Sequence, residues 1–291
     1  MKHWNQRWAA WIAPSFVIIW STGFIIAKYG MPYAEPMTFL FMRFIGVLLL
    51  MLPLVWLLKA PWPSSSNTFH IAIAGLLLQA GYLGGVWAAV RFGMSAGLTA
   101  LIVGLQPILT ALFASWLRER VYPIQWLGLA LGIAGVGLVV WQKLTLTGLD
   151  SWSLIFIVIA LFSITAGTLY QKKFCPQFDL RTGSVIQFAS SALLCLPFMF
   201  LFETREIVWH PELIGSLVWA ILGLSIGAIS LLFIMIRKGE ATRVTSLMYL
   251  TPPTTAVMAW FLFDEPFTLF IAFGIVLTML AVLLVNRAQK S

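Results

Sequence analysis

Apolar residues fill most of this chain in long runs, and short polar segments separate the runs. A helix that crosses the hydrocarbon core of a bilayer needs about 20 apolar residues. The runs have this length and predict ten membrane-spanning helices, at residues 9–29, 35–58, 69–91, 94–117, 123–142, 152–173, 180–202, 211–236, 240–263 and 266–286. Because the connections between them are short, we expect an all-α integral membrane protein without a soluble domain.

The composition agrees with this pattern. Hydrophobic residues make up 60% of the chain and charged residues 10%, and the mean hydropathy is +0.94. In a soluble globular protein about 25% of the residues are charged. The polar surface is therefore too small to cover a water-soluble protein of 32.4 kDa. An aqueous enzyme, a disordered scaffold and a nucleic-acid-binding protein are excluded, despite the net charge of +8.

The basic residues predict the orientation in the membrane. If the N-terminus is cytoplasmic, thirteen Lys and Arg residues fall in cytoplasmic segments and four on the opposite side, while Arg43 lies within a span. Cytoplasmic loops of membrane proteins are enriched in Lys and Arg. We therefore expect both termini in the cytoplasm. The net basicity indicates contact with anionic lipid of the inner leaflet rather than with nucleic acid.

Residues 91–140 resemble the segment that lies 146 residues further along the chain. The offset pairs several residues that are not simply apolar: Arg91 with Arg237, Pro107 with Pro253, and Glu119 with Glu265. The sequence thus predicts two five-helix halves, residues 1–148 and 149–291. Because five is odd, the second half enters the membrane from the opposite side. Such an inverted repeat is typical of secondary transporters.

Proline residues interrupt corresponding spans of the two halves. Pro107 lies in the fourth span, and Pro252 and Pro253 lie in the ninth. Proline removes a helix hydrogen bond and frees a carbonyl, which inside a membrane needs a partner or a water-filled cavity. We interpret these interruptions as part of a substrate site, with simple packing kinks as the alternative.

Polar and aromatic residues within the spans are expected to meet around a central path. Besides the three prolines, the candidates are Trp20, Ser21, Gln79, Tyr82, Trp87, Thr99, Gln106, Ser163, Gln187, Thr245 and Tyr249. Hydrogen bonding or packing between helices is the alternative role for each of them. We expect the first, third, fourth, sixth, eighth and ninth spans to line the path. Trp260 also lies well within a span, and such rings stack on flat or cationic ligands.

Arg43 is a further candidate because an ionisable residue within a span is a functional hypothesis by default. It lies eight residues beyond Glu35, which is about 12 Å along a helix. Contact with a substrate carboxylate and structural anchoring near the interface are equal interpretations. No Asp, Glu or His is clearly within a predicted span, so facilitated diffusion is the simplest mechanism, and coupling through an acid at a helix end stays open.

Short motifs along nearly the whole chain resemble the EamA-type branch of the drug/metabolite transporter superfamily. They are Trp20-Ser21-Thr22-Gly23-Phe24, Pro36 with Arg43, Gly93-Met94-Ser95-Ala96, Gln106-Pro107, Arg118-Glu119-Arg120, Thr251-Pro252-Pro253 and Asp264-Glu265-Pro266. Within the superfamily the chain looks most like the bacterial exporters of aromatic amino acids and paraquat. The resemblance implies efflux of amino acids and related metabolites through a central cavity. Gly23 departs from the pattern, since many relatives carry Asn there.

The sequence therefore predicts a bacterial inner-membrane exporter of amino acids, aromatic or hydrophobic ones foremost, and of related metabolites, working by alternating access. The expected partners are the small-molecule substrate and membrane lipid, and not nucleic acid; a monomer is expected and a dimer is left open. The sequence has no metal cluster, nucleotide-binding motif or nucleophile constellation, so we expect no cofactor and no enzymatic activity. A drug or nucleotide-sugar carrier is the alternative within transport, and a polytopic membrane enzyme is the alternative from another class.

Overall fold

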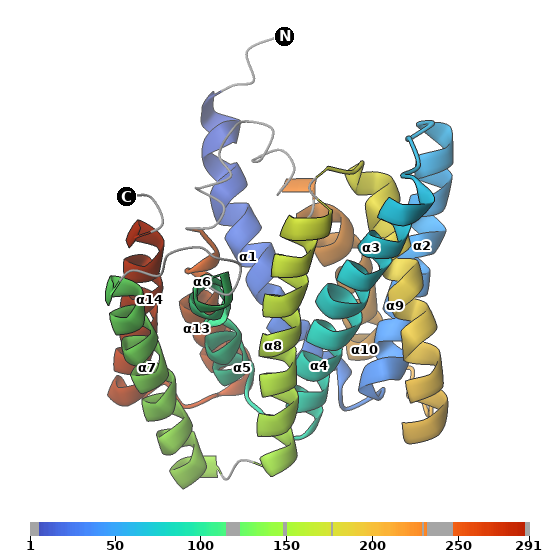
Figure 1. Ribbon diagram of the computed structural model, residues 1–291. Coiled ribbons are helices and arrows are strands. Elements are labelled where there is room, and N and C mark those ends of the chain that lie inside the picture. The colour runs from blue at the N-terminus through green and yellow to red at the C-terminus, as the bar shows by residue number, and fades with distance from the viewer. Residues whose placement is uncertain are drawn as a thin grey trace.

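The computed structural model of the protein describes residues 6–114, 123–147, 150–175, 177–228, 230–231 and 247–288 (Figure 1). Within these residues every regular element is a helix. The long uninterrupted helices are α1 (Gln6–Gly30), α2 (Pro36–Leu57), α7 (Pro123–Thr147), α8 (Ser151–Phe174), α9 (Leu180–Phe202) and α14 (Leu269–Ala288). The predicted all-α fold is confirmed.

The remaining helices change their geometry along their length. The π-helical segments are η1 (Leu76–Gly81), between α3 (Ser65–Gly75) and α4 (Tyr82–Arg91), and η3 (Ala220–Ala228), which continues α10 (Pro211–Trp219). Two turns divide other spans: Gly104 and Leu105 separate α5 (Ala96–Val103) from α6 (Gln106–Ala114), and Tyr249 and Leu250 precede α13 (Thr251–Phe263). These four irregularities lie in the third, fourth, eighth and ninth predicted spans.

The described helices agree approximately with the ten predicted spans. Seven helical stretches are long and apolar enough to cross a membrane, and they correspond to the first four spans and to the sixth, seventh and eighth. Shorter apolar helices at Trp126–Gln142 and Leu269–Leu284 correspond to the fifth and tenth, and α13 is part of the ninth. Figure 1 shows that α1 begins and α14 ends at the same end of the molecule, as an even number of crossings requires.

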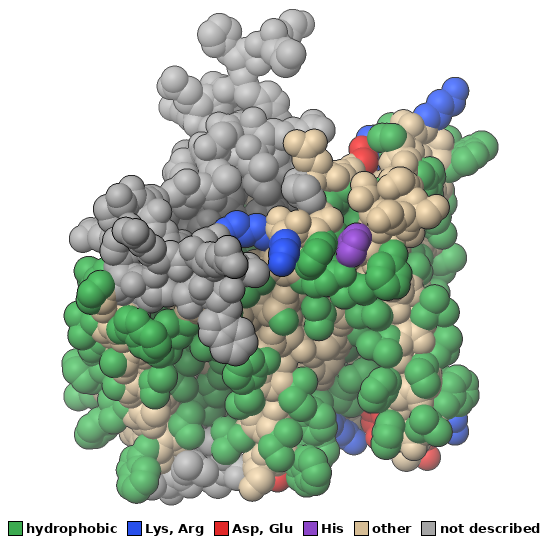
Figure 2. Space-filling view, viewed as in Figure 1, with side chains coloured by type: hydrophobic (Ala, Val, Ile, Leu, Met, Phe, Trp, Pro, Cys, Tyr) green, Lys and Arg blue, Asp and Glu red, His purple; other side chains and the backbone are tan. Residues whose placement is uncertain are grey.

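The flanks of the helix bundle are apolar. Hydrophobic side chains form a broad band in Figure 2, and the charged side chains visible on that face lie towards its two ends. Large residues such as Trp56, Leu201 and Leu269 have exposed fractions of 78%, 75% and 89%. Contiguous apolar surface of this extent is unfavourable in water, whereas lipid tails solvate it. The protein is a multi-pass membrane protein.

The irregular segments occupy corresponding places in the two halves. The π-helical segments η1 and η3 begin 144 residues apart, at Leu76 and Ala220. The turns at Gly104–Leu105 and Tyr249–Leu250 lie 145 residues apart. The proline pattern predicted the two turns, and the structure places each of them just before its prolines. The π-helical segments are new, since no sequence feature was interpreted as predicting them.

Helices α7 and α14 pack side by side at one edge of the molecule (Figure 1). Their contact depends on glycine, because a Cβ atom on Gly135 would lie 2.7 Å from the carbonyl oxygen of Gly274 and 2.7 Å from the hydroxyl of Thr278. Close contact of backbones through small residues is a common way for membrane helices to associate. The fifth and tenth spans can therefore approach each other closely at this point because glycine has no side chain.

We expect Gly135→Leu to push α7 away from α14 and to destabilise the protein by about 1–3 kcal/mol, the usual cost of overpacking. Thermal denaturation of the detergent-solubilised protein, followed by size-exclusion chromatography, measures the effect. Gly137→Leu is the matched control, since a Cβ atom on Gly137 would have no neighbouring atom within 4 Å. An equal loss in both variants would contradict the role of close backbone contact.

Candidate functional site

Two adjoining cavities lie among the helices near the interrupted segments. Their volumes are about 70 Å³ and about 210 Å³. Both are lined by Trp20, Phe24, Tyr82 and Ile164, so they adjoin each other, and we call the two together the central cavity. Its smaller part lies beside the two helix turns and its larger part beside the π-helical segments.

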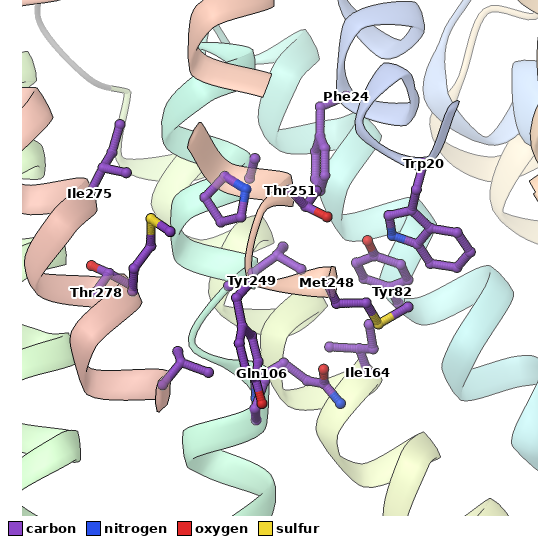
Figure 3. A pocket seen from close by; sticks show the side chains of 17 residues that line it. Trp20, Phe24, Tyr82, Gln106, Ile164, Met248, Tyr249, Thr251, Ile275 and Thr278 are labelled. Carbon is purple, nitrogen blue, oxygen red and sulfur yellow. The ribbon is translucent and has the colours of Figure 1, made fainter. Parts of the chain in front are cut away.

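The smaller part of the central cavity is built around the two turns (Figure 3). Gly104, Gln106 and Pro107 line it from the fourth span, and Tyr249 and Pro252 from the ninth. Proline has no N–H, so Pro107 offers no donor to the carbonyl of the residue four positions earlier, and the same holds for Pro252. Both turns thus place backbone carbonyls without their usual helical partner beside the cavity.

Several polar side chains line this part of the cavity, among them Gln106 and Tyr249. Gln106 donates hydrogen bonds from Nε2 to the hydroxyl of Thr168 at 3.2 Å and to that of Thr110 at 3.4 Å. The buried hydroxyl of Tyr249 has no hydrogen-bond partner among the described residues. Leaving a buried polar group unpaired costs about 1–3 kcal/mol. A ligand that hydrogen-bonds the Tyr249 hydroxyl would recover this free energy.

The larger part of the central cavity contains the guanidinium of Arg43. Arg43 has an exposed fraction of 6%, and its Nε and Nη2 donate to the hydroxyl of Ser225 at 3.3 and 3.1 Å. The Ser225 hydroxyl in turn donates to the carbonyl of Ala220, five residues earlier. The π-helical geometry of η3 thereby holds Ser225 against Arg43. Gln79 of η1 lies on the wall of the same cavity.

Aromatic and aliphatic side chains form most of the remaining wall. The larger part is lined by Trp20, Phe24, Trp87, Phe188 and Leu224, among others. Among the residues that the structure describes, no Asp or Glu lines either part of the central cavity. The cavity therefore combines an apolar wall with a few hydrogen-bonding groups and one cation, as is usual for small-molecule sites.

Comparison with known proteins agrees with this architecture. The sequence profile of the EamA-like transporter family matches residues 7–141 and matches again at residues 151–287. The chain belongs to the EamA-like transporter family. The two matches fall one in each predicted half, and they cover nearly the whole chain.

Several EamA relatives are similar over most of their length. The uncharacterized transporter YvbV of Bacillus subtilis is 27% identical, and the match covers 100% of this chain and 95% of the relative. The uncharacterized inner membrane transporter YedA of Escherichia coli is 26% identical over 83% of this chain and 78% of its own. A probable amino-acid metabolite efflux pump of Salmonella typhimurium is 28% identical over 67% of this chain and 63% of its own. These relatives are named as transporters, which fits a protein that is not an enzyme.

A solved structure supports the fold independently. A protein crystal structure with 15% sequence identity superimposes with a TM-score of 0.67, and the match covers 96% of this chain and 98% of the other. At this identity the similarity concerns the fold alone.

The structure brings many of the predicted path residues of this EamA transporter to one place. The central cavity is lined by Trp20, Arg43, Gln79, Tyr82, Trp87, Gln106, Pro107, Tyr249 and Pro252. All six spans expected around the path contribute residues, and α2, α9 and α14 contribute as well. The part that each of these residues plays in transport stays a prediction.

Other predicted path residues lie away from the cavity wall. Ser21, Thr99, Ser163, Gln187 and Pro253 are absent from the lining of the central cavity. Thr99 is fully buried and donates to the carbonyl of Ser95, while Gln187 donates to Gln171. Thr99 and Gln106 would share one face of an unbroken helix, but the turn at Gly104–Leu105 changes the register between them. Thr245 lies outside the described residues.

The three tryptophans that lie well within predicted spans have different environments. Trp20 lines both parts of the central cavity, and Trp87 lines the larger part and stacks on Phe39 with ring centroids 4.3 Å apart. Trp260, by contrast, has an exposed fraction of 48% on the lipid-facing flank. Depth along a span therefore did not indicate which face of the helix the ring occupies.

Sequence reasoning missed Ser225, which places the Arg43 side chain. A signal was present, since the offset of 146 residues that defines the repeat carries Gln79 onto Ser225. The two residues belong to corresponding π-helical segments. Extending the repeat alignment to the third and eighth spans would have identified Ser225 as a candidate.

Acidic side chains connect helices at the end of the molecule that lies opposite the start of α1 and the end of α14. Glu265 is buried and accepts hydrogen bonds from Lys28 Nζ at 2.6 Å and from the backbone N–H groups of Ala96 and Gly97 at 3.0 and 3.4 Å. A negative charge is favourable at this position because the N-terminus of a helix carries a partial positive charge. Glu265 thus joins the first span, the fourth span and the loop that precedes α14.

A second carboxylate at this end acts in the same way. Glu203 follows α9 and accepts hydrogen bonds from the backbone N–H groups of Met37 and Thr38 at 2.6 and 2.8 Å. Nearby, Glu212 accepts a hydrogen bond from the Tyr33 hydroxyl at 2.8 Å, and this bond raises the pKa of the phenol. All three acidic residues belong to the second half and their partners to the first.

We expect Glu265→Gln to lower the thermal stability, because the variant leaves Lys28 without its ion pair and weakens the cap of α5. Losing a charged hydrogen-bond partner at a largely buried position costs about 1–3 kcal/mol. Thermal denaturation in detergent measures this loss, and the double variant with Lys28→Gln is expected to lose less than the sum of the two single variants. Glu206→Gln, at an exposed position near the same end, is the control and should resemble the wild type. Additive losses would contradict direct pairing of Lys28 with Glu265.

Proposed function

We propose that this EamA transporter is a bacterial inner-membrane exporter of amino acids, aromatic and hydrophobic ones foremost, and of related small metabolites. The observation that carries the proposal is the position of the central cavity. It lies where corresponding spans of the two halves are interrupted, at the turns and at the π-helical segments. In secondary transporters built from repeats, substrate sites lie at such interrupted helices.

The chemistry of the cavity wall supports small substrates with an apolar body. Trp20, Phe24, Trp87 and Phe188 provide aromatic surface, while Gln106, Tyr249 and Arg43 provide groups that hydrogen-bond a polar end. The Salmonella typhimurium relative, named as a probable amino-acid metabolite efflux pump, supports amino acids and their metabolites as the substrate range.

The mechanism that we propose is alternating access by facilitated diffusion. Contacts of Glu265, Glu203 and Glu212 join the two halves at the end of the molecule that we assign to the outer face. Export requires these contacts to break and others to form at the cytoplasmic end, where we place both termini. None of the described acidic residues lines the central cavity, so substrate movement need not be coupled to a proton carried there.

Counterflow into liposomes of the purified protein tests this function. We expect accumulation of radiolabelled phenylalanine, tryptophan or leucine when the liposomes contain the unlabelled compound, and no accumulation in protein-free liposomes. A proton gradient should not change the equilibrium level. Absence of flux for amino acids and for related carboxylates and amines would refute the export proposal, and concentrative uptake that follows a proton gradient would refute facilitated diffusion.

Two tryptophan variants test whether the transported substrate binds in the central cavity. We expect Trp20→Leu to reduce the counterflow rate about tenfold or more, because the ring lines both parts of the cavity and a lost aromatic contact costs about 1–3 kcal/mol. Trp260→Leu removes a ring of the same size from the lipid-facing flank and should leave the rate near that of the wild type. Equal effects of the two variants would contradict the placement of the substrate in the central cavity.

A further inference from the structure

We infer that the central cavity is a site for a monocarboxylate with an apolar body, and that it disfavours a substrate which also carries an ammonium group. The inference rests on the proposed function and, within the proposed range, moves the preferred substrate from amino acids to related carboxylates. It is carried by the surroundings of Arg43, by the residues that line the cavity, and by the direction of two helix N-termini.

Arg43 is a buried cation that no carboxylate neutralises within the described residues. A guanidinium has five N–H donors, and the described hydrogen bonds of Arg43 go to one neutral acceptor, the Ser225 hydroxyl. Buried charges in proteins are normally paired, because an unpaired charge loses its hydration without compensation. Since Arg43 lines the larger part of the cavity, a ligand placed there can supply the missing anion.

The geometry of the guanidinium favours a carboxylate as that anion. Arginine binds carboxylates through two parallel hydrogen bonds, which are stronger than bonds between neutral groups. Nε and Nη2 of Arg43 each donate one hydrogen bond to the Ser225 hydroxyl. Both hydrogens of Nη1 and the second hydrogen of Nη2 remain for the ligand. The two terminal nitrogens together present the fork that a carboxylate fits.

Charge balance then decides between a carboxylic acid anion and a zwitterionic amino acid. A monoanion bound to Arg43 makes the occupied cavity neutral. A zwitterion brings an additional ammonium group, and among the described residues no Asp or Glu lines the cavity to receive it. Aromatic rings such as Trp20 attract cations, and the carbonyls at the two turns can accept hydrogen bonds, but neither carries a full negative charge and Arg43 repels the ammonium group. The bound zwitterion therefore leaves a net positive charge in the cavity.

The adjoining smaller part of the cavity is also suited to negative charge. Gln106 and Thr251, at the first residues of α6 and α13, both line it. The N-terminus of a helix carries a partial positive charge, and discontinuous helices direct such ends at anionic substrate groups in other transporters. Two helix ends and one guanidinium thus offer positive charge to an anion in the central cavity, while most of its wall is apolar.

Three compounds with the same phenyl ring test the inference: 3-phenylpropionate, phenylalanine and phenethylamine. Binding to the purified wild-type protein is measured by isothermal titration, and competition with counterflow is measured in liposomes. We expect 3-phenylpropionate to bind best, phenylalanine to bind about tenfold more weakly or worse, and phenethylamine not to bind measurably; a tenfold change corresponds to about 1.4 kcal/mol. Equal or tighter binding of phenylalanine would overturn the inference.

Variants of Arg43 identify the group that selects the anion. Arg43→Gln should weaken 3-phenylpropionate binding at least about tenfold and reduce the preference over phenethylamine, whereas Arg43→Lys should retain the order of the three compounds. Arg205→Gln, an exposed arginine outside the cavity, is the control. Unchanged affinity in correctly folded Arg43→Gln would overturn the role of Arg43. The wild-type series needs no variant, so the inference stays testable even when a variant does not fold.

The outcomes separate this inference from the proposed function. Counterflow of amino acids with a preference for the zwitterion would leave the exporter intact and overturn the monocarboxylate site. Flux of none of the three compounds, or of any amino acid, would overturn the proposed function itself. Flux of 3-phenylpropionate above that of phenylalanine supports export through the central cavity and the inferred site, and it places related carboxylates ahead of amino acids in the substrate range.

Discussion

The architecture of this EamA transporter depends on one constraint, the need of every backbone N–H and C=O group in a membrane for a hydrogen-bond partner. Helices satisfy it within one segment, so departures from regular helix are tolerated only where protein or a water-filled cavity receives the freed groups. Here the departures are the turns before Pro107 and Pro252 and the segments η1 and η3, and all of them border the central cavity. The substrate site that we propose and the irregular backbone therefore lie at the same place, because both need a cavity within the protein.

The same requirement explains the carboxylates at the end opposite the termini. Each helix begins with N–H groups that have no partner within the helix. Glu203 satisfies those of α2, and Glu265 satisfies those of α5. In both cases the acid comes from one half of the chain and the helix from the other. The hydrogen bonds that complete these helices are thus also the contacts that hold the two halves together, so that separating the halves at this end exposes unsatisfied helix ends.

Much of the fold follows from patterns that act over many residues. Apolar runs of membrane-spanning length predicted the helices, and matched prolines predicted the turns, because proline removes a donor regardless of its surroundings. Side-chain direction was less accessible. Thr99 was assigned to the path on the assumption of an unbroken helix, and the turn at Gly104 altered the register. Ser225 was missed because its contact with Arg43 depends on π-helical geometry, which arises from packing between spans and has no local sequence signal comparable to proline.

No carboxylate among the described residues neutralises Arg43, so the proposed site favours an anion. The charge of that anion makes its transport depend on the membrane potential. An elementary charge that crosses the membrane gains or loses about 2.3 kcal/mol for each 100 mV of membrane potential. An anion that leaves a cell with a negative interior moves in the favourable direction, whereas a zwitterion gains nothing from the potential. The anion site that we propose around Arg43 therefore lets the voltage across the membrane drive the proposed export, and an exporter of this kind needs no acidic side chain to carry a proton through the bilayer.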